Sequence, residues 1–186
     1  MNEIEETTLA AAQRGSQKAF RKLYDYYAPL VWRLCYRASN GEKRIAEEIM
    51  QDVFIKVHRS LNSFRGNSAF STWLFRVTYN ATMEYHSKIT RWNRFNKPLE
   101  EDLVGEQRQD TLEAQQQIQL ILEPLSSEER FLLTAREVEG LTYDELAVII
   151  GESEGALRTK VSRLKTSIKN RLQKNNGEVV INDTNR

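Results

Sequence analysis

Helical periodicity runs through most of this chain of 186 residues, and one long interruption divides it into two groups of helices. Apolar residues recur every three or four positions rather than every second one, which is the repeat of a helix and not of a strand. With three prolines and eight glycines, the chain has few residues that break helices. The pattern therefore predicts an all-α protein.

The first helical group extends from about Thr8 to about Thr90, and its breaks predict four or five helices. These breaks lie at Gly15, Pro29, 39–41 and 62–67. The second group begins near Thr111 and closes with a helix that ends near Gln173.

Between Arg91 and Asp110 the periodicity fades and polar and acidic residues gather around Pro98 and Gly105, as in a flexible linker. The chain is accordingly divided into two small helical domains with a linker and a tail. The predicted bounds are 1–92 for the first domain, 93–110 for the flexible acidic linker, 111–174 for the second domain and 175–186 for a disordered tail.

The net charge of +1 conceals blocks of opposite sign. Residues 14–97 carry 16 Lys and Arg against 6 Asp and Glu, residues 98–154 carry 3 against 15, and residues 155–174 carry 7 against none. Because neutralisation of phosphates dominates affinity for nucleic acid, the two basic blocks suit two polyanion-binding surfaces and the acidic block suits a segment that stays off DNA. Ordinary solvated helix faces would also give charge runs of this kind.

Several classes of protein fit the sequence poorly. Its apolar runs are too short for a transmembrane helix or a secretory signal, which indicates a cytosolic protein. Cys35 is the single cysteine and lies far from His58 and His86 in sequence, so neither an internal disulfide nor a zinc site is expected. The chain has no catalytic carboxylate cluster, nucleophile triad or phosphate loop, so we expect no enzyme and no cofactor.

Residues 141–154 form a short helix, a glycine turn and a new helix start, which is the pattern of a helix-turn-helix. The capping boxes at Ser126 and Thr142 and the N-cap at Ser153 predict the starts of the last three helices. In the last helix the apolar stripe runs to Leu172, and the remaining positions after Gly155 carry basic residues and no carboxylate. We expect this helix to read duplex DNA, with Arg158 and Lys160 in its first turns best placed for bases. The acidic helix over 127–139, with an apolar stripe that includes Val138, is expected to support it and to face away from phosphate.

A helix from about Phe70 to about Ser87 carries a second candidate surface. Trp73, Arg76, Asn80 and Met83 share one of its stripes, beside the stripe that faces the core. Aromatic, guanidinium and amide groups on one face can stack and hydrogen-bond unpaired bases. Trp73 fits an ordinary core position equally well, whereas a mid-helix Asn80 needs a reason beyond helix propensity.

The helix over 42–59 carries an acidic cluster of Glu47, Glu48, Gln51 and Asp52 opposite its apolar face. This acidic cluster could be a solvated face or a docking patch for a basic protein partner.

The residues from Ala46 to Val57 and from Leu61 to Asn80, with Ser63 to Gly66 and Phe70 to Leu74, resemble region two of bacterial RNA polymerase sigma factors. The residues from Leu125 to Leu172, including the run from Arg136 to Tyr143, are similar to region four. The two stretches cover most of the chain in the family's order without a third domain between them, as in the extracytoplasmic-function (ECF) subfamily. The family usually has Gly-Thr-Val at the start of the recognition helix and an arginine at the position of Lys160, whereas this chain has Gly155, Ala156 and Leu157.

The resemblance implies an alternative sigma factor, a dissociable subunit that directs core RNA polymerase to promoter DNA and helps to open it. It implies docking on the largest catalytic subunits of the polymerase through Glu48, Gln51, Asp52 and Phe54. It implies capture of the nontemplate strand at the minus-ten element through Phe64, Arg65, Ser71, Thr72, Trp73, Arg76 and Asn80. It implies recognition of the minus-thirty-five element as duplex through Arg158, Thr159, Lys160, Arg163 and Lys165.

The resemblance further implies that the acidic linker runs near the path of nascent RNA and that an anti-sigma partner covers the binding faces and can hold the protein at the membrane. No small-molecule substrate is implied. The alternatives are a helix-turn-helix regulator that does not recruit polymerase and an enzyme such as a nuclease.

Overall fold

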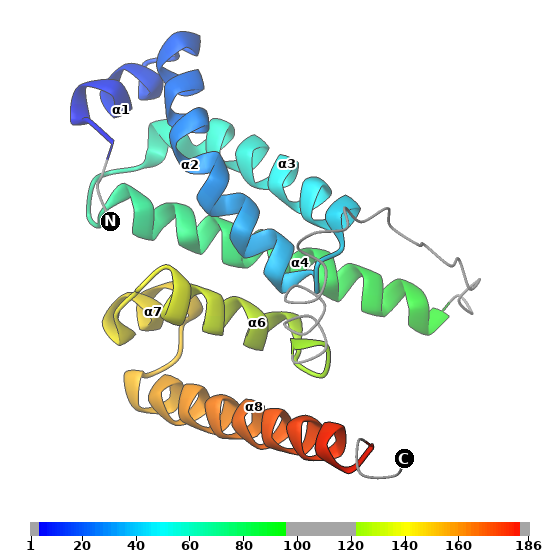
Figure 1. Cartoon of the computed structure of the whole chain (residues 1–186). Coiled ribbons are helices and arrows are strands. Elements are labelled where there is room, and N and C mark those ends of the chain that lie inside the picture. Colours follow the sequence, from blue (N-terminus) through cyan, green and yellow to red (C-terminus); the bar gives the residue numbers. More distant parts are fainter. Residues whose placement is uncertain (1–3, 96–121, 183–186) are drawn as a thin grey trace.

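The structure, a computed structural model, describes residues 4–95 and 122–182, without the side chains of 93, 95 and 174–182. Within these ranges the chain is helical and contains no strand, which confirms the predicted fold class (Figure 1). The first unit comprises α1 (Glu6–Gln13), α2 (Gln17–Ala38), α3 (Lys43–Ser60), a 3-10 turn (Leu61–Ser63) and α4 (Phe70–Phe95). The second comprises α6 (Ser127–Leu133), a π-helical segment (Thr134–Val138), α7 (Tyr143–Ile150) and α8 (Glu154–Asn182).

Helices α2, α3 and α4 pack around the core of the first unit, and α1 covers one end of α2. Each contributes an apolar stripe of helical spacing, so that Leu23, Leu34, Val53 and Leu74 are fully buried. Cys35 is among these buried residues, and burial raises the pKa of its thiol to about 12, in keeping with a packing role. The long helices thus form a rigid base for whatever lies on their outer faces.

Pro29 was expected to break the first helical group, but it lies inside α2. Proline removes one hydrogen bond of the helix and crowds the preceding turn, at a cost of about 3 kcal/mol. Tyr27, Leu30 and Val31 are buried on both sides of it, and their packing holds the helix together through the defect. Tertiary contacts have overridden the local signal.

Helix α4 continues to Phe95, beyond the end predicted near Ser87 and into the first residues of the predicted linker. An ion pair joins Lys88 to Glu84 at 2.6 Å, one turn apart. Such pairs favour helix continuation where the sequence has no breaker. The remainder of the predicted linker and the start of the second helical group, 96–121, lie outside the described residues.

The predicted helix starts of the second unit are confirmed. Ser126 and Thr142 each make a complete capping box, and Ser153 accepts a hydrogen bond from the amide of Ala156. Gly151 ends α7 with a φ of 85°, a left-handed conformation that glycine adopts without strain. These caps fix the turn between the two helices of the helix-turn-helix.

The acidic helix predicted over 127–139 is not one regular α-helix. Its second half is π-helical, and the amide of Glu139 donates to the carbonyl of Thr134 five residues back. The wider turn shifts the register of the helix face, so Val138 is 64% exposed rather than packed inward. The predicted stripe therefore ends at Ala135.

Helix α8 runs to Asn182, whereas a disordered tail was predicted from 175. Extending a helix that has already formed costs little per residue, which accounts for the longer helix. Leu172, predicted on the inward stripe, is 40% exposed because the helices of its own unit give it little cover at that end. No helix among the described residues is long and apolar enough to cross a bilayer.

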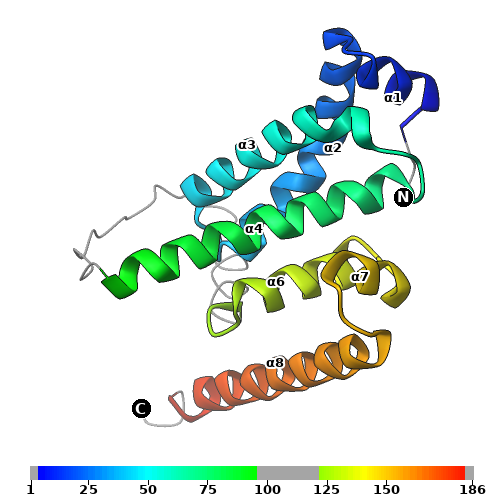
Figure 2. The ribbon, with the colours of Figure 1, turned by 180° about the vertical axis from the view of Figure 1, so that it is seen from behind.

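The two units touch: α6 packs against α2 and α4, and α7 packs against α4 (Figure 2). Tyr79 of α4 meets Phe131 of α6 edge-on, with ring centroids 5.3 Å apart. The buried guanidinium of Arg130 donates to the carbonyl of Ala38 at the end of α2, at 3.1 Å. Arg33 and Glu139 add an ion pair at 2.8 Å.

Candidate nucleic-acid interfaces

Three aromatic rings gather where the loop after α3 enters α4. Phe64, Phe70 and Trp73 lie with ring centroids 5.4–5.5 Å apart in each pair. The side-chain amide of Gln13 donates to the carbonyl of Phe64 at 2.8 Å and so ties the loop to α1. Phe70 is buried and Trp73 is partly exposed, so Trp73 packs against the cluster and still leaves part of its side chain accessible to solvent.

The other residues predicted to bind the minus-ten element differ in access. Arg65, Arg76 and Asn80 are exposed, and Thr72 is partly buried. Ser71 is 6% exposed, so little of this residue is accessible to DNA in this structure. It lies next to Phe70 on the inner side of the first turn, where a small side chain is needed.

The acidic cluster on α3 is partly neutralised by neighbouring groups. Glu48 accepts a hydrogen bond from the hydroxyl of Tyr85 at 2.9 Å, and this bond, with burial as the larger cause, raises the pKa of Tyr85 to about 12. Lys56 bridges Asp52 at 2.8 Å and Glu84 at 2.7 Å. Gln51 is exposed, and together these groups form a patterned polar surface rather than a block of free negative charge.

Phe54, predicted as a polymerase contact, is 7% exposed. It lies in the wall of a hollow of about 480 Å³ between α2 and α3, together with Tyr24, Gln51 and Ile55. Ile55 is 48% exposed, so the hollow has an apolar rim that a partner helix could cover. Phe54 thus shapes the surface more than it projects from it.

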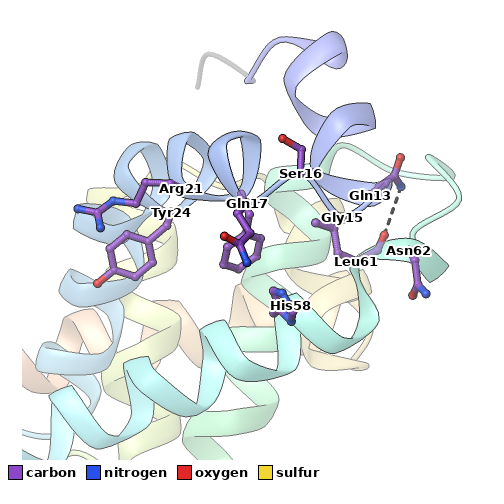
Figure 3. A pocket seen from close by; sticks show the side chains of 11 residues that line it. Gln13, Gly15, Ser16, Gln17, Arg21, Tyr24, His58, Leu61 and Asn62 are labelled. Atoms are coloured by element: carbon purple, nitrogen blue, oxygen red, sulfur yellow. Dashed lines mark hydrogen bonds between the residues drawn. The ribbon is translucent and has the colours of Figure 1, made fainter.

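A second hollow, of about 490 Å³, adjoins the first at the turn between α1 and α2 (Figure 3). Phe20, Tyr24 and His58 line both, and the ring of Phe20 meets that of His58 at 4.9 Å. The figure shows Gln13 bonded to Leu61 at its far side. The sequence analysis did not predict this second hollow, although Phe20 and Tyr24, one helical turn apart on α2, could have indicated it.

Arg158 lies at the start of α8 with 61% of its side chain exposed. Its guanidinium lies over the ring of Tyr143, 4.5 Å from the centroid, and forms an ion pair with Glu154 at 3.3 Å. Thr159 and Arg163 are exposed on the same helix. The first turns of α8 therefore present polar side chains outward, as the prediction for a recognition helix requires.

Two lysines of α8 form ion pairs with carboxylates. Lys160 contacts both Glu128 and Glu152, and its side chain is 30% exposed. Hydrogen bonds to Glu128 and the attraction of both carboxylates outweigh the effect of burial and raise the pKa of Lys160. Lys165 pairs with Glu137 at 2.8 Å. The acidic helix was expected to face away, yet its carboxylates reach the recognition helix.

Comparison with known proteins finds matches for both units. Residues 23–92 match the family model described as Sigma-70 region 2, and residues 115–168 match that described as Sigma-70, region 4. The ECF RNA polymerase sigma-E factor of Escherichia coli (strain K12) is 32% identical over 175 residues, covering 87% of this chain and 90% of that protein. The ECF RNA polymerase sigma-E factor of Haemophilus influenzae is 31% identical over 179 residues, covering 87% of this chain and 91% of that protein.

Two solved structures share the fold. The structure of CnrH in complex with the cytosolic domain of CnrY superposes with a TM-score of 0.66 at 20% identity, covering 90% of this chain and 96% of that one. The structure of the sigma factor RpoE in complex with the anti-sigma factor NepR from Bartonella quintana superposes with a TM-score of 0.64 at 21% identity, covering 84% of this chain and 98% of that one.

Proposed function

The chain belongs to the ECF RNA polymerase sigma factors, and from this membership we propose which of its residues perform each part of the work. It is an alternative sigma factor that directs transcription, and sigma factors are a family of regulators rather than of enzymes. We assign strand capture to the start of α4, duplex recognition to the start of α8, and polymerase docking to α3 with the hollow beside it.

The aromatic cluster on α4 supports capture of unpaired bases at the minus-ten element. Packing holds Phe64 and Trp73, so a base can stack on them without first ordering a mobile side chain. Arg65, Arg76 and Asn80 offer exposed donors beside these rings. Thr72 can contribute its hydroxyl, whereas the buried Ser71 supports the turn.

Docking on the largest catalytic subunits of core polymerase is supported by the pairing of an apolar hollow with carboxylates. Phe54 and Ile55 offer apolar surface, and Glu48, Gln51 and Asp52 surround it with polar groups. A basic amphipathic helix of the partner would fit both features, because its apolar face enters the hollow while its cations meet the carboxylates.

Recognition of the minus-thirty-five element is supported by the exposure of Arg158, Thr159 and Arg163 after a correctly capped helix-turn-helix. Arginine can meet guanine with two hydrogen bonds. Lys160 and Lys165 must first leave Glu128, Glu152 and Glu137, so we expect them to contribute less than Arg158.

We also propose that an anti-sigma factor controls this chain. The two solved structures of the same fold contain an anti-sigma factor or a cytosolic partner domain, which supports the idea. A factor of this kind acts where the chromosome is, so a cytoplasmic location follows, with retention at the membrane if the anti-sigma factor is anchored there. The acidic linker would run through the polymerase near the nascent RNA.

The observation that carries the assignment is that the exposed Asn80 lies on the same stripe of α4 as Trp73, two turns from the packed aromatic cluster. Asn80→Ala should leave binding of the holoenzyme to duplex promoter intact and impair opening, because the amide would contact only an unpaired base. The measurements are a gel-shift titration and permanganate reactivity of thymines in the bubble. Asn170→Ala, the same change at an exposed position of α8, is the matched control.

Normal permanganate reactivity with Asn80→Ala would refute the role of Asn80. The alternative of a regulator that does not recruit polymerase predicts tight duplex binding by the free chain at physiological salt and no transcription with core enzyme. A sigma factor gives weak binding alone and run-off transcript only with core polymerase.

A further inference from the structure

Helix α7 begins with a tyrosine that contacts two guanidinium groups. The Cζ atoms of Arg136 and Arg158 each lie 4.5 Å from the centroid of the Tyr143 ring. At this distance the face of an aromatic ring attracts a cation. We propose that Tyr143 is a positioning residue that holds the Arg158 guanidinium ready to read a base, a proposal that rests on the function proposed for Arg158.

The position of the tyrosine ring is itself fixed by its neighbours. Thr142 caps α7: its hydroxyl accepts from the amide of Glu145 at 3.2 Å, and the carboxylate of Glu145 accepts from the amide of Thr142 at 2.7 Å. These bonds place Tyr143 at the first position of the helix, and its ring is partly buried against the core. The second guanidinium, of Arg136, is anchored by a hydrogen bond to the carbonyl of Leu141. The ring is therefore a fixed support rather than a mobile neighbour.

Arg158 needs such a support more than Lys160 and Lys165, which are paired with carboxylates outside α8. The side chain of Arg158 is 61% exposed. Its ion pair with Glu154 joins two exposed side chains one helical turn apart, and a surface pair of this kind restricts the guanidinium only weakly. A bidentate contact with guanine requires the planar guanidinium in one orientation, and holding that orientation before binding lowers the entropic cost. Lys160, by contrast, is already paired with two carboxylates.

This arrangement has a specific consequence for promoter choice. A ring that orients Arg158 strengthens binding to the correct base more than to a wrong one, because only the correct base uses the preset geometry. Loss of the ring should therefore reduce discrimination at the single base pair that Arg158 reads. Loss of packing alone would lower transcription from every promoter equally.

The test uses holoenzyme assembled from core polymerase and the full chain, on promoters that differ one base pair at a time in the upstream element. The variants are Tyr143→Leu, which keeps apolar bulk without the ring, Tyr143→Phe, which keeps the ring, and Arg158→Ala. For Tyr143→Leu we expect discrimination at one base pair to fall about two- to five-fold, the value of one exposed cation–π contact. Tyr143→Phe should retain discrimination, and adding Tyr143→Leu to Arg158→Ala should remove nothing further.

The outcomes separate this inference from the function on which it rests. If Arg158→Ala alters no base preference, the assignment of Arg158 fails, and the inference with it. If Arg158→Ala relaxes one position but Tyr143→Leu lowers transcription uniformly, the assignment stands and the positioning role is overturned. Melting temperatures of the variants show whether a uniform loss reflects unfolding.

Discussion

The two proposed DNA surfaces hold their side chains by different means. At the start of α4, aromatic rings pack against one another, and Phe70 at their centre is 3% exposed. At the start of α8, polar side chains are held from outside the helix, with Arg158 over a ring and Lys160 and Lys165 in ion pairs. The surface at the start of α4 is therefore an extension of the hydrophobic core. At the surface on α8, by contrast, side chains make contacts that DNA could replace.

The difference suits the two forms of DNA. An unpaired base must find a rigid ring on which to stack, and packing supplies rigidity that salt does not screen. Duplex phosphates already carry counterions. A lysine that must leave a carboxylate to meet a phosphate gains less affinity than an unpaired lysine would. It is also less prone to bind a wrong partner. The comparison predicts that truncation damages the first surface most and that salt affects the second most.

The largest effect is expected at Phe70. Phe70→Ala should lower the free energy of unfolding by about 3–5 kcal/mol, because a buried ring is replaced by a cavity beneath Phe64 and Trp73. Denaturant unfolding followed by circular dichroism measures this change. The control is Leu172→Ala on α8, where the side chain is 40% exposed and should cost under about 1 kcal/mol. Equal costs at the two positions would contradict the contrast between a packed and an exchangeable surface.

The next effect is expected at Arg158. Arg158→Ala should weaken promoter binding by the holoenzyme by about 1–3 kcal/mol and relax preference at one base pair. Competition binding with single-base variants of the upstream element measures both. Lys169→Ala, an exposed cation outside the predicted reading set, should weaken all sequences alike. An unchanged base preference with Arg158→Ala would mean that α8 does not read sequence through this residue.

A smaller effect is expected at Lys160. Lys160→Met should change duplex affinity by only about 0.5 kcal/mol, because the ammonium must leave Glu128 and Glu152 before it meets phosphate. The slope of log affinity against log salt should fall less than with Arg163→Gln, which removes an exposed cation. A loss with Lys160→Met as large as that with Arg158→Ala would show that the two carboxylates release Lys160 on binding.

The smallest effect is expected from an ion pair on another face of α4. Hydrogen bonds from Lys56 and Lys88 lower the pKa of Glu84 to about 2, below the 4.5 of the unfolded chain. The ionised Glu84 carboxylate therefore contributes to the free energy of unfolding above about pH 4.5, and this contribution is lost as the pH falls through about 2. Glu84 is 46% exposed, so solvent screening keeps the contribution small. Unfolding of wild type and Glu84→Gln across this range should diverge only slightly, and a large divergence would mean that ion pairs also hold α4 in place.

The elements with strong local signals were predictable from sequence. The capping boxes at Ser126 and Thr142 and the glycine at 151 determine backbone hydrogen bonds within a few residues, so the helix starts of the second unit could be located. Apolar stripes of helical spacing likewise identified the inward faces of α3, α4 and the first half of α8. The order of the two units followed from motifs that lie wholly within each.

Features that depend on distant neighbours, or on a departure from regular α-helix geometry, were not predictable. Pro29 stays helical because residues on other helices bury its neighbours, and Val138 is exposed because a π turn changes the register. Nothing in the sequence indicates that Lys160 is paired, because its partner Glu128 lies 32 residues away along the chain. Tyr143 carried no signal of its own, since contact with Arg158 requires the turn between the helices to be folded.

Arg130 joins the two units through backbone carbonyls rather than through a side chain. Besides Ala38, its guanidinium donates to the carbonyl of Leu125 at 2.6 Å and more weakly to those of Leu122 and Glu123. Every residue has a carbonyl, so substitutions at these acceptor positions leave the acceptors in place. These four hydrogen bonds therefore depend on the identity of one side chain, that of Arg130, and only on the backbone of the residues that accept them.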